Sequence, residues 1–203
     1  MKKIITTLIA VLGICTAAFS QTRGTTEFGV NVGVNGSTVT TGYGQTNSDY
    51  RTGFNFAVSA DYYFSDSWSI KGKLIYDQKG WDNGFIDLGS GQYVTDYKLN
   101  YITVPVLANW HFARTRNWYL HFGPYVGFLL NATETSQGTD LKDAFSSTDV
   151  GLMVGIGVKI PVSEKAKLFL EINGQGSGTD LVKNNQGTAL RSEVSSFNIG
   201  FNF

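Results

Sequence analysis

Two histidines, His111 and His121, are the residues best suited by type and spacing to do chemistry. Each lies in a run where apolar and polar residues alternate, and each falls on the polar side of its run. Two imidazoles on neighbouring strands can form a metal pair or part of a hydrolase site. However, no serine lies in a recognisable nucleophile motif, and the sequence places no carboxylate beside either histidine. We therefore expect interior hydrogen bonds from both, and no catalytic, cofactor-binding or metal-binding residue.

Two acidic groups offer oxygen ligands of the kind that Ca²⁺ prefers. One is the Asp-Asn-Gly run at residues 82–84, and the other is the set Asp140, Asp143 and Asp149. Asp-Asn and Asn-Gly are common turn sequences, so we expect ordinary turns here rather than a calcium site. The Gly-Ser-Gly run at 176–178 lacks the Lys-Ser/Thr of a phosphate loop and predicts the start of a flexible loop.

The composition suggests a surface that is not entirely exposed to water. The 203 residues are enough for one domain, and they include 24 glycines and 14% aromatic residues. Charged residues make up only 16%, whereas a soluble domain usually has about 25%. The chain has no basic patch that would indicate nucleic-acid binding.

The first 20 residues have the pattern of a cleavable signal peptide. Lys2 and Lys3 precede an apolar stretch at 4–16, and small residues around Ser20 favour cleavage there. Removing this segment takes away two lysines from the 16 basic residues and leaves all 16 acids, so the mature chain carries a net charge of −2. It also removes the one cysteine, so no disulfide supports the fold. We expect a signal peptide at 1–20 and one domain at 21–203.

The domain consists of segments in which apolar and polar residues alternate with period two, which is typical of β-strands with one greasy face. Eight such segments occur, at 28–35, 52–64, 68–77, 97–112, 118–130, 150–160, 167–173 and 194–203. Pro105 cannot donate to a strand ladder, so it predicts a local bulge. The last segment needs a partner on each side, and closure of the sheet into a barrel supplies both.

The connections between these segments alternate long, short, long, short, long, short, long. This asymmetry and an even strand number are typical of outer-membrane barrels, with both termini in the periplasm. Aromatic residues flank the short turns, as in the girdles at the two membrane surfaces. Those near the short turns are Phe64, Trp68, Phe112, Trp118 and Phe203, and Tyr76 and Trp81 lie near the opposite rim. Four aromatic residues in the long loops are candidates for exposed contacts with a partner: Tyr50, Trp81, Phe85 and Tyr93.

The alternative is a soluble lipocalin-like barrel, whose apolar face would point inward. That protein would need a well-charged outer face, whereas the polar side here is mostly Gly, Ala, Ser and Asn. Small residues suit a crowded interior, and an eight-stranded barrel is just wide enough to be filled by its side chains. We therefore predict an all-β, antiparallel, up-and-down transmembrane barrel with no open pore. The charged residues expected to pair inside it are Asp61, Lys71, Lys73, Asp77, Lys159 and Glu171.

Four motifs, in this order, resemble the outer membrane protein β-barrel family of Bacteroidota that is often labelled PorT-like. They are Tyr-Ile-Thr-Val-Pro-Val-Leu at 101–107, Gln-Lys-Gly at 78–80, a Gly-rich strand at 151–157 and Gly-Phe-Asn-Phe at 200–203. The similarity covers essentially the whole mature chain. Thr103 departs from it, because the family often has an acid there, so we do not expect an interior ion pair at this position.

The resemblance implies a membrane barrel but assigns no specific activity. The first hypothesis is a non-enzymatic barrel of the Gram-negative outer membrane that supports the envelope or presents its long loops to a partner. The second, implied by the PorT-like resemblance, is an accessory component of a secretion or gliding apparatus. The third is a small enzyme acting on lipid. The expected partners are outer-membrane lipid and lipopolysaccharide, an envelope protein at the loops, and the barrel-assembly machinery, whose recognition signal Phe203 resembles.

Overall fold

The computed structural model describes residues 23–41, 48–87, 92–184 and 187–203, so the predicted signal peptide lies outside the described residues. The described chain forms eight strands and one short 3-10 helix. Their bounds are β1 (Thr26–Thr41), β2 (Asp49–Tyr63), β3 (Trp68–Asp87), β4 (Gln92–Phe112), β5 (Trp118–Glu134), η1 (Lys142–Ala144), β6 (Thr148–Pro161), β7 (Lys167–Ser177) and β8 (Leu190–Asn202). Among these residues, no helix is long and apolar enough to cross a membrane.

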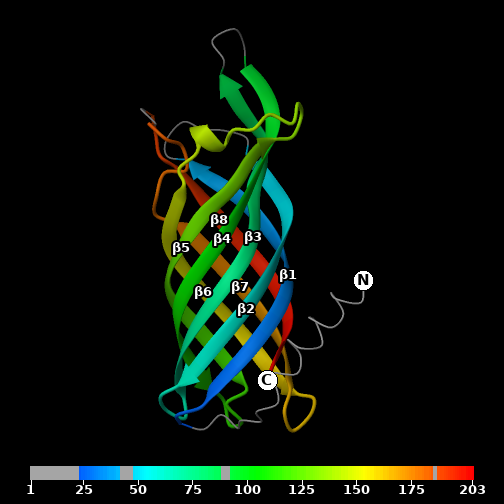
Figure 1. Ribbon diagram of the computed structural model, residues 1–203, viewed down its shortest axis with the longest axis vertical. Helices are drawn as coiled ribbons and strands as arrows, with labels where there is room; N and C mark the ends of the chain where they lie inside the picture. The colour runs from blue at the N-terminus through cyan, green and yellow to red at the C-terminus, as the bar shows by residue number, and fades with distance from the viewer. Residues whose placement is uncertain (1–22, 42–47, 88–91, 185–186) are drawn as a thin grey trace, which may run out of the picture.

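The eight strands close into a single antiparallel barrel, as the alternation predicts (Figure 1). Each strand pairs with its neighbours in sequence, and β8 pairs with β1 from Gly29↔Asn202 to Thr41↔Leu190. Beyond the end of β8, the backbone N–H of Phe203 donates to the carbonyl of Phe28 at 2.8 Å, and the reverse bond measures 3.2 Å. Closure leaves no unpaired strand edge in the wall of the barrel.

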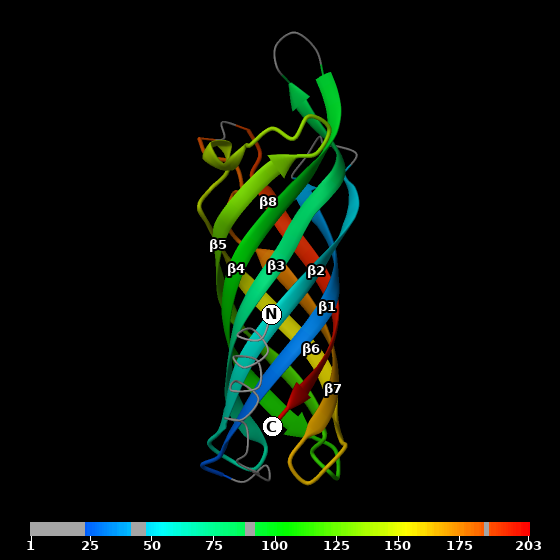
Figure 2. The same cartoon turned by 45° about the vertical axis from the view of Figure 1, so that its right-hand side comes forward.

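The two ends of the barrel differ, as the loop lengths predict. The short connections after β2, β4 and β6 lie at one end together with the C-terminus, and the long connections lie at the other (Figures 1 and 2). We call these the turn end and the loop end. The β3–β4 hairpin rises beyond every other strand at the loop end (Figure 2).

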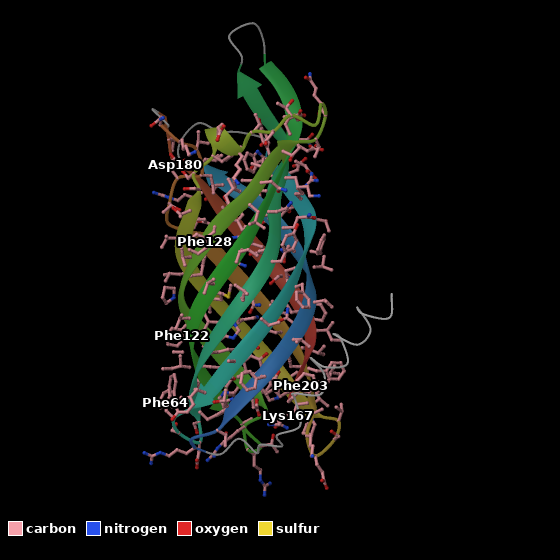
Figure 3. All side chains as sticks on the ribbon, viewed as in Figure 1. Phe64, Phe122, Phe128, Lys167, Asp180 and Phe203 are labelled. Atoms are coloured by element: carbon pink, nitrogen blue, oxygen red, sulfur yellow. The ribbon has the colours of Figure 1, made fainter. Side chains whose placement is uncertain are left out.

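The apolar face of each strand points outward and the polar face points inward. On β1, for example, Val32 is 55% exposed, whereas the neighbouring Asn31 is 4% exposed. Phe64, Phe122 and Phe128 lie on the outer wall in Figure 3. The outer wall is so apolar that it is stable only in contact with lipid. In water, the barrel would expose a far larger apolar surface than soluble proteins tolerate.

The strands are longer than predicted, and this changes the position of one aromatic residue. The sequence predicts a long connection between the strands at 68–77 and 97–112, but β3 continues to Asp87 and β4 begins at Gln92. Period two therefore continues to Trp81, which is 5% exposed inside the barrel and stacks on Tyr97 with ring centroids 4.4 Å apart. The prediction that Trp81 lies at the rim or on an exposed loop is wrong. Tyr50 is 66% exposed, as predicted, and the side chains of Phe85 and Tyr93 lie outside the described residues.

The bulge predicted at Pro105 is also wrong. The β4–β5 register is the same at Pro105↔Tyr125 and at Ala108↔Phe122, so no residue is inserted there. The pairing is interrupted only between these two pairs, where Val106 lies opposite Pro124, and Pro124 has no N–H to donate. The register shift between β4 and β5 lies instead at Asn100/Tyr101.

Aromatic residues gather on the outer wall at the turn end, as predicted. Phe64, Trp68 and Trp118 are 44%, 37% and 46% exposed. Trp110 is also exposed, at 42%, and stacks on Trp68 with ring centroids 6.3 Å apart. Such rings are typical of side chains that lie at the level of lipid headgroups.

Candidate functional site

The lumen of the barrel contains nearly all the buried charge of the described chain, in balanced numbers. The strands place it there because charged residues fall on the inward phase of the alternation. The carboxylates are Glu27, Asp61, Asp77, Asp149 and Glu171, and the lysines are Lys71, Lys73, Lys79, Lys159 and Lys167. These five acids match five lysines, of which Lys167 is only partly buried, and Glu134 at the loop end is the one further buried acid of the described chain. The six charged residues predicted to pair inside all do so.

The first group of charges lies nearest the turn end. The Lys159 ammonium donates to Glu27 at 2.6 Å, to the Tyr63 hydroxyl at 2.6 Å and to Asp61 at 3.4 Å. Lys167 binds the other oxygen of Glu27 at 2.5 Å and is 20% exposed at the rim (Figure 3). Two acids and two lysines neutralise each other here, so neither sign is in excess.

The second group, at mid-height, is centred on the fully buried Glu171 on β7. Its two oxygens accept from Lys71 at 3.2 Å and from Lys73 at 2.8 Å. They also accept from the Tyr119 hydroxyl and from the Asn173 amide, each at 2.8 Å. Four donors therefore satisfy one carboxylate, which is what a buried charge requires to be stable.

The third group lies toward the loop end, around Lys79. Its ammonium is 3.2 Å from Asp149 and 3.6 Å from Asp77. Asp149 also accepts from the Tyr125 hydroxyl at 3.1 Å, and Asp77 accepts from Asn35 at 2.8 Å. Thr103 donates to Asp77 at 3.2 Å, so this position makes a hydrogen bond rather than an ion pair.

Inward glycines on β6 make room for the rings of β5. Tyr119, His121 and Tyr125 lie directly opposite Gly157, Gly155 and Gly151. A Cβ added to any of these glycines would come within 2.1–2.4 Å of its nearest neighbour. The rings therefore lie across the glycines and fill the centre of the lumen. The Lys71 ammonium lies 5.0 Å from the centroid of the Tyr119 ring, a cation–π distance.

Above the charged groups, the lumen becomes apolar at the loop end. Trp81 and Tyr97 stack there, and Phe145, from the β5–β6 connection, packs edge-on against both at 6.0 and 6.2 Å. Leu181, from the β7–β8 connection, belongs to the same buried cluster. The two connections also bind each other, because the backbone N–H of Ser146 donates to the Leu181 carbonyl at 2.7 Å. We call this arrangement the apolar cap.

Both histidines are buried inside and hydrogen-bonded, as predicted. His111 Nε2 lies 2.9 Å from the Ser69 hydroxyl, and His121 Nε2 lies 2.8 Å from the Asn173 amide oxygen. They do not form a metal pair, because the Tyr119 ring lies between them, 6.0 and 5.8 Å from the two imidazoles. No group of three or more residues that could hold a metal ion occurs in the described part of the chain.

A carboxylate lies near each histidine in the fold, although the sequence places none beside them. Asp61 is 3.9 Å from His111 Nε2, and Glu171 is 3.7 Å from His121 Nδ1. Ser69, His111 and Asp61 come together from three neighbouring strands, which sequence order does not reveal. They do not form a hydrolase triad, because the acid and the serine approach the same imidazole nitrogen and all three side chains are buried.

The acidic residues considered as calcium ligands are dispersed. Asp149 points into the lumen, whereas Asp140 and Asp143 are exposed on the connection before it. Asp82 pairs with Arg51 at 2.6 Å, and Asn83 lies at a register shift of the β3–β4 hairpin rather than in a free turn. The calcium hypothesis therefore fails for the second group. The Gly-Ser-Gly run at 176–178 spans the end of β7 and the start of the following connection, and Ser177 donates to Asp149.

The outer wall contains a hollow of about 690 Å³. It lies over the loop-end halves of β6, β7 and β8, where Gly174, Gly176 and Ser195 leave space beside Leu152 and Val154. All five belong to the outward phase of their strands, so the hollow faces the lipid side. Ser69 and His111 are buried in the lumen, so this hollow on the outer wall gives a substrate no access to them.

Comparisons with known proteins agree with this architecture. Residues 19–175 match the family described as outer membrane protein beta-barrel domain. No curated protein sequence matches the chain. The crystal structure of OprG from Pseudomonas aeruginosa is similar, with 13% identity, a TM-score of 0.51 and coverage of 91% of this chain and 98% of that chain. Neisserial surface protein A is 21% identical, with a TM-score of 0.51 and coverage of 87% and 97%.

The family match spans most of the chain, and the two solved structures share its fold. The apolar outer wall, the short turns at one end and the aromatic girdle all fit the same environment. The turn end thus faces the periplasm and the loop end faces the cell exterior. This chain belongs to the outer membrane protein beta-barrel domain family, and its eight strands cross the outer membrane.

Proposed function

We propose that this protein is a non-enzymatic, non-conducting barrel that presents its loop end to a partner in the cell envelope. The main support for this proposal is that the lumen is filled by three groups of ion pairs and, toward the loop end, by the apolar cap. A solute would have to break buried ion pairs and separate the two interlocked connections to pass. Both steps are costly in a closed barrel of this width.

The β3–β4 hairpin supports a role in partner contact. The last β2 residue that pairs with β3 is Asp49, opposite Asp82, and the last β5 residue that pairs with β4 is Glu134, opposite Tyr97. Beyond these points the hairpin strands pair with each other as far as Asp87↔Gln92. No other strand of the described chain covers their outer edges. Exposed edges of this kind bind extended segments of other proteins by strand addition.

The PorT-like resemblance suggests a secretion or gliding apparatus as the source of that partner. The Tyr-Ile-Thr-Val-Pro-Val-Leu motif that carries the resemblance lies on β4, the same strand that forms half of the hairpin. Outer-membrane lipid and lipopolysaccharide are the partners proposed for the apolar wall.

Solute flux through the purified barrel tests the closed lumen. Proteoliposomes that contain the mature protein should swell in small sugars no faster than protein-free liposomes, and planar bilayers should show no steady conductance. A steady conductance, or swelling that increases with the protein-to-lipid ratio, contradicts the proposal.

Site-specific photo-crosslinking in intact cells tests the partner. A crosslinker at Val94, which is 55% exposed on the hairpin, should give a discrete protein adduct. A crosslinker at Leu152, which is 69% exposed on the lipid-facing wall, is the matched control and should give no such adduct. Identical adducts at both positions, or none at Val94, contradict a hairpin partner.

We also propose that the barrel-assembly machinery recognises the Phe203 side chain. The contribution of Phe203 to the folded barrel is mainly its backbone pairing with Phe28, which a change of side chain preserves. Phe203→Ala should therefore refold in detergent like the wild type but yield less folded protein in cells. Equal cellular yields of the two proteins would argue against recognition of this ring.

A further inference from the structure

The turn end of the barrel is not uniform around its circumference. Three arginines lie on the side formed by β1 to β5: Arg23 precedes β1, and Arg114 and Arg116 lie in the β4–β5 turn. The one exposed acid among these described segments is Asp66, in the β2–β3 turn. On the opposite side, Glu164 and Lys165 in the β6–β7 turn balance each other. Positive charge is therefore in excess on one side only.

The three tryptophans of the outer wall lie on the same side, whereas β1 and β8 present the exposed phenylalanines Phe28 and Phe201 near this end. Trp68 and Trp110 face each other across β3 and β4, and Phe112 and Trp118 face each other across β4 and β5. Phe64 ends this group at the foot of β2 and lies across the rim from Phe203 and Lys167 in Figure 3. We call Arg114, Arg116 and these outward aromatic side chains the arginine–aromatic rim.

The geometry of the β4–β5 turn separates the roles of its two arginines. Arg116 Nη1 lies 3.3 Å from Asp66, which ties this turn to the neighbouring β2–β3 turn. Arg114 is exposed and has no ion pair with any residue that the structure describes. It follows Phe112 by two residues, so its guanidinium belongs just beyond the rings, where the membrane surface begins.

We propose that the arginine–aromatic rim is a binding site for anionic phospholipid of the periplasmic leaflet. Indole rings position a lipid at the boundary between headgroup and acyl chain. A guanidinium binds a phosphate with two parallel hydrogen bonds and keeps its charge at any physiological pH. The combination suits a phosphodiester headgroup with a net negative charge, and the excess of arginine over acid discriminates against a zwitterionic one.

Tryptophan fluorescence provides a direct measurement, because Trp68, Trp110 and Trp118 lie on the rim while Trp81 is buried in the lumen. The mature barrel is reconstituted in phosphatidylcholine vesicles, and phosphatidylglycerol or phosphatidylcholine with brominated acyl chains is titrated in as quencher. We expect the brominated phosphatidylglycerol to associate with the rim about fivefold more strongly, since each basic residue near an anionic surface contributes about that factor. The preference should fall as NaCl rises, because salt screens exposed charges.

The variant R114Q/R116Q should lose most of this preference. R114K/R116K keeps the charges but loses the paired guanidinium hydrogen bonds, so it should retain more of the preference than R114Q/R116Q does. K142Q/K183Q removes two positive charges from the loop end and should leave the preference unchanged. A wild type that quenches equally with both lipids overturns the proposal. So does a preference that R114Q/R116Q preserves or that NaCl does not weaken. The salt titration needs only the wild type, so it decides the question even if a variant fails to fold.

Discussion

The middle of the lumen and its extracellular mouth close the same channel by different physical means. In the middle, Glu171 and its partners form a network of charges on strands whose backbones are fixed by pairing on both sides. At the mouth, Phe145 and Leu181 pack apolar side chains from two connections that bind each other and the neighbouring strand ends through separate hydrogen bonds rather than through continuous strand pairing. The charged network is thus part of the wall, whereas the apolar cap is attached to it. The difference implies that the network determines global stability and that the cap determines local opening.

The largest effect should follow from neutralising the centre of the network. Glu171→Gln keeps the shape of the side chain but leaves Lys71 and Lys73 buried without their counterion. We expect a loss of about 3–5 kcal/mol in the free energy of unfolding, as for other buried ion pairs that lose one partner. The measurement is urea unfolding in vesicles, followed by the gel-mobility shift that distinguishes folded barrels.

Asp66→Asn is the control, because its pair with Arg116 is exposed and should contribute less than about 1 kcal/mol. Adding Lys73→Gln to Glu171→Gln should recover part of the loss, because it removes one of the two unpaired charges. If Glu171→Gln were as stable as the wild type, the lysines would have to be solvated, and the lumen would contain water rather than a dry network.

An intermediate effect should follow from filling a space that the network needs. The Cβ of Gly157→Ala would lie 2.4 Å from the Tyr119 ring and 2.8 Å from the Leu170 carbonyl. Tyr119 cannot withdraw easily, because its hydroxyl is bound to Glu171. We expect a loss of about 1–3 kcal/mol, the usual cost of overpacking, in the same unfolding assay.

Gly72→Ala is the matched control on the outer wall. Nothing lies within 4 Å of the added Cβ there, so the substitution should be neutral or slightly stabilising. Equal losses at positions 157 and 72 would show that backbone conformation, rather than ring packing, sets the cost of losing a strand glycine.

The contrast between network and cap also explains how much of the molecule could be predicted from its sequence. Period-two alternation is a local property, and it correctly predicted eight strands, the direction of each face and six of the lumen charges. Glu27, Lys79 and Asp149 were missed only because the predicted strands were too short. Each continues the polar phase of its strand by one step, so extending the alternation would have included them.

The residues that pair across the barrel could not be predicted in this way. Ser69, His111 and Asp61 meet because β2, β3 and β4 are neighbours with a particular register, and register depends on the whole sheet. The apolar cap is harder still, because Phe145 and Leu181 lie in connections with no periodicity. They are brought together by contacts between two loops, including the Phe145↔Val182 bridge and the Ser146–Leu181 backbone bond, which no local pattern in the sequence indicates.

The smallest effect on global stability should come from the apolar cap. Phe145→Ala removes the ring that packs against Trp81 and Tyr97 but leaves every strand pair and lumen charge in place. We expect unfolding of the barrel to change by less than about 1 kcal/mol, because an element attached to the rim can open without unfolding the rest. Local opening should increase clearly, seen as faster amide hydrogen exchange and faster trypsin cleavage at Lys142 and Lys183.

Val162→Ala is the control for this last variant, since Val162 is an exposed apolar residue in a connection at the turn end and should leave the loop-end exchange rates unchanged. Conductance then distinguishes the two barriers. Phe145→Ala should remain non-conducting, because the ion pairs around Lys79 and Glu171 still fill the lumen below the opened cap. A steady conductance in this variant would show that the cap is the barrier to solutes and that the charged network serves stability alone.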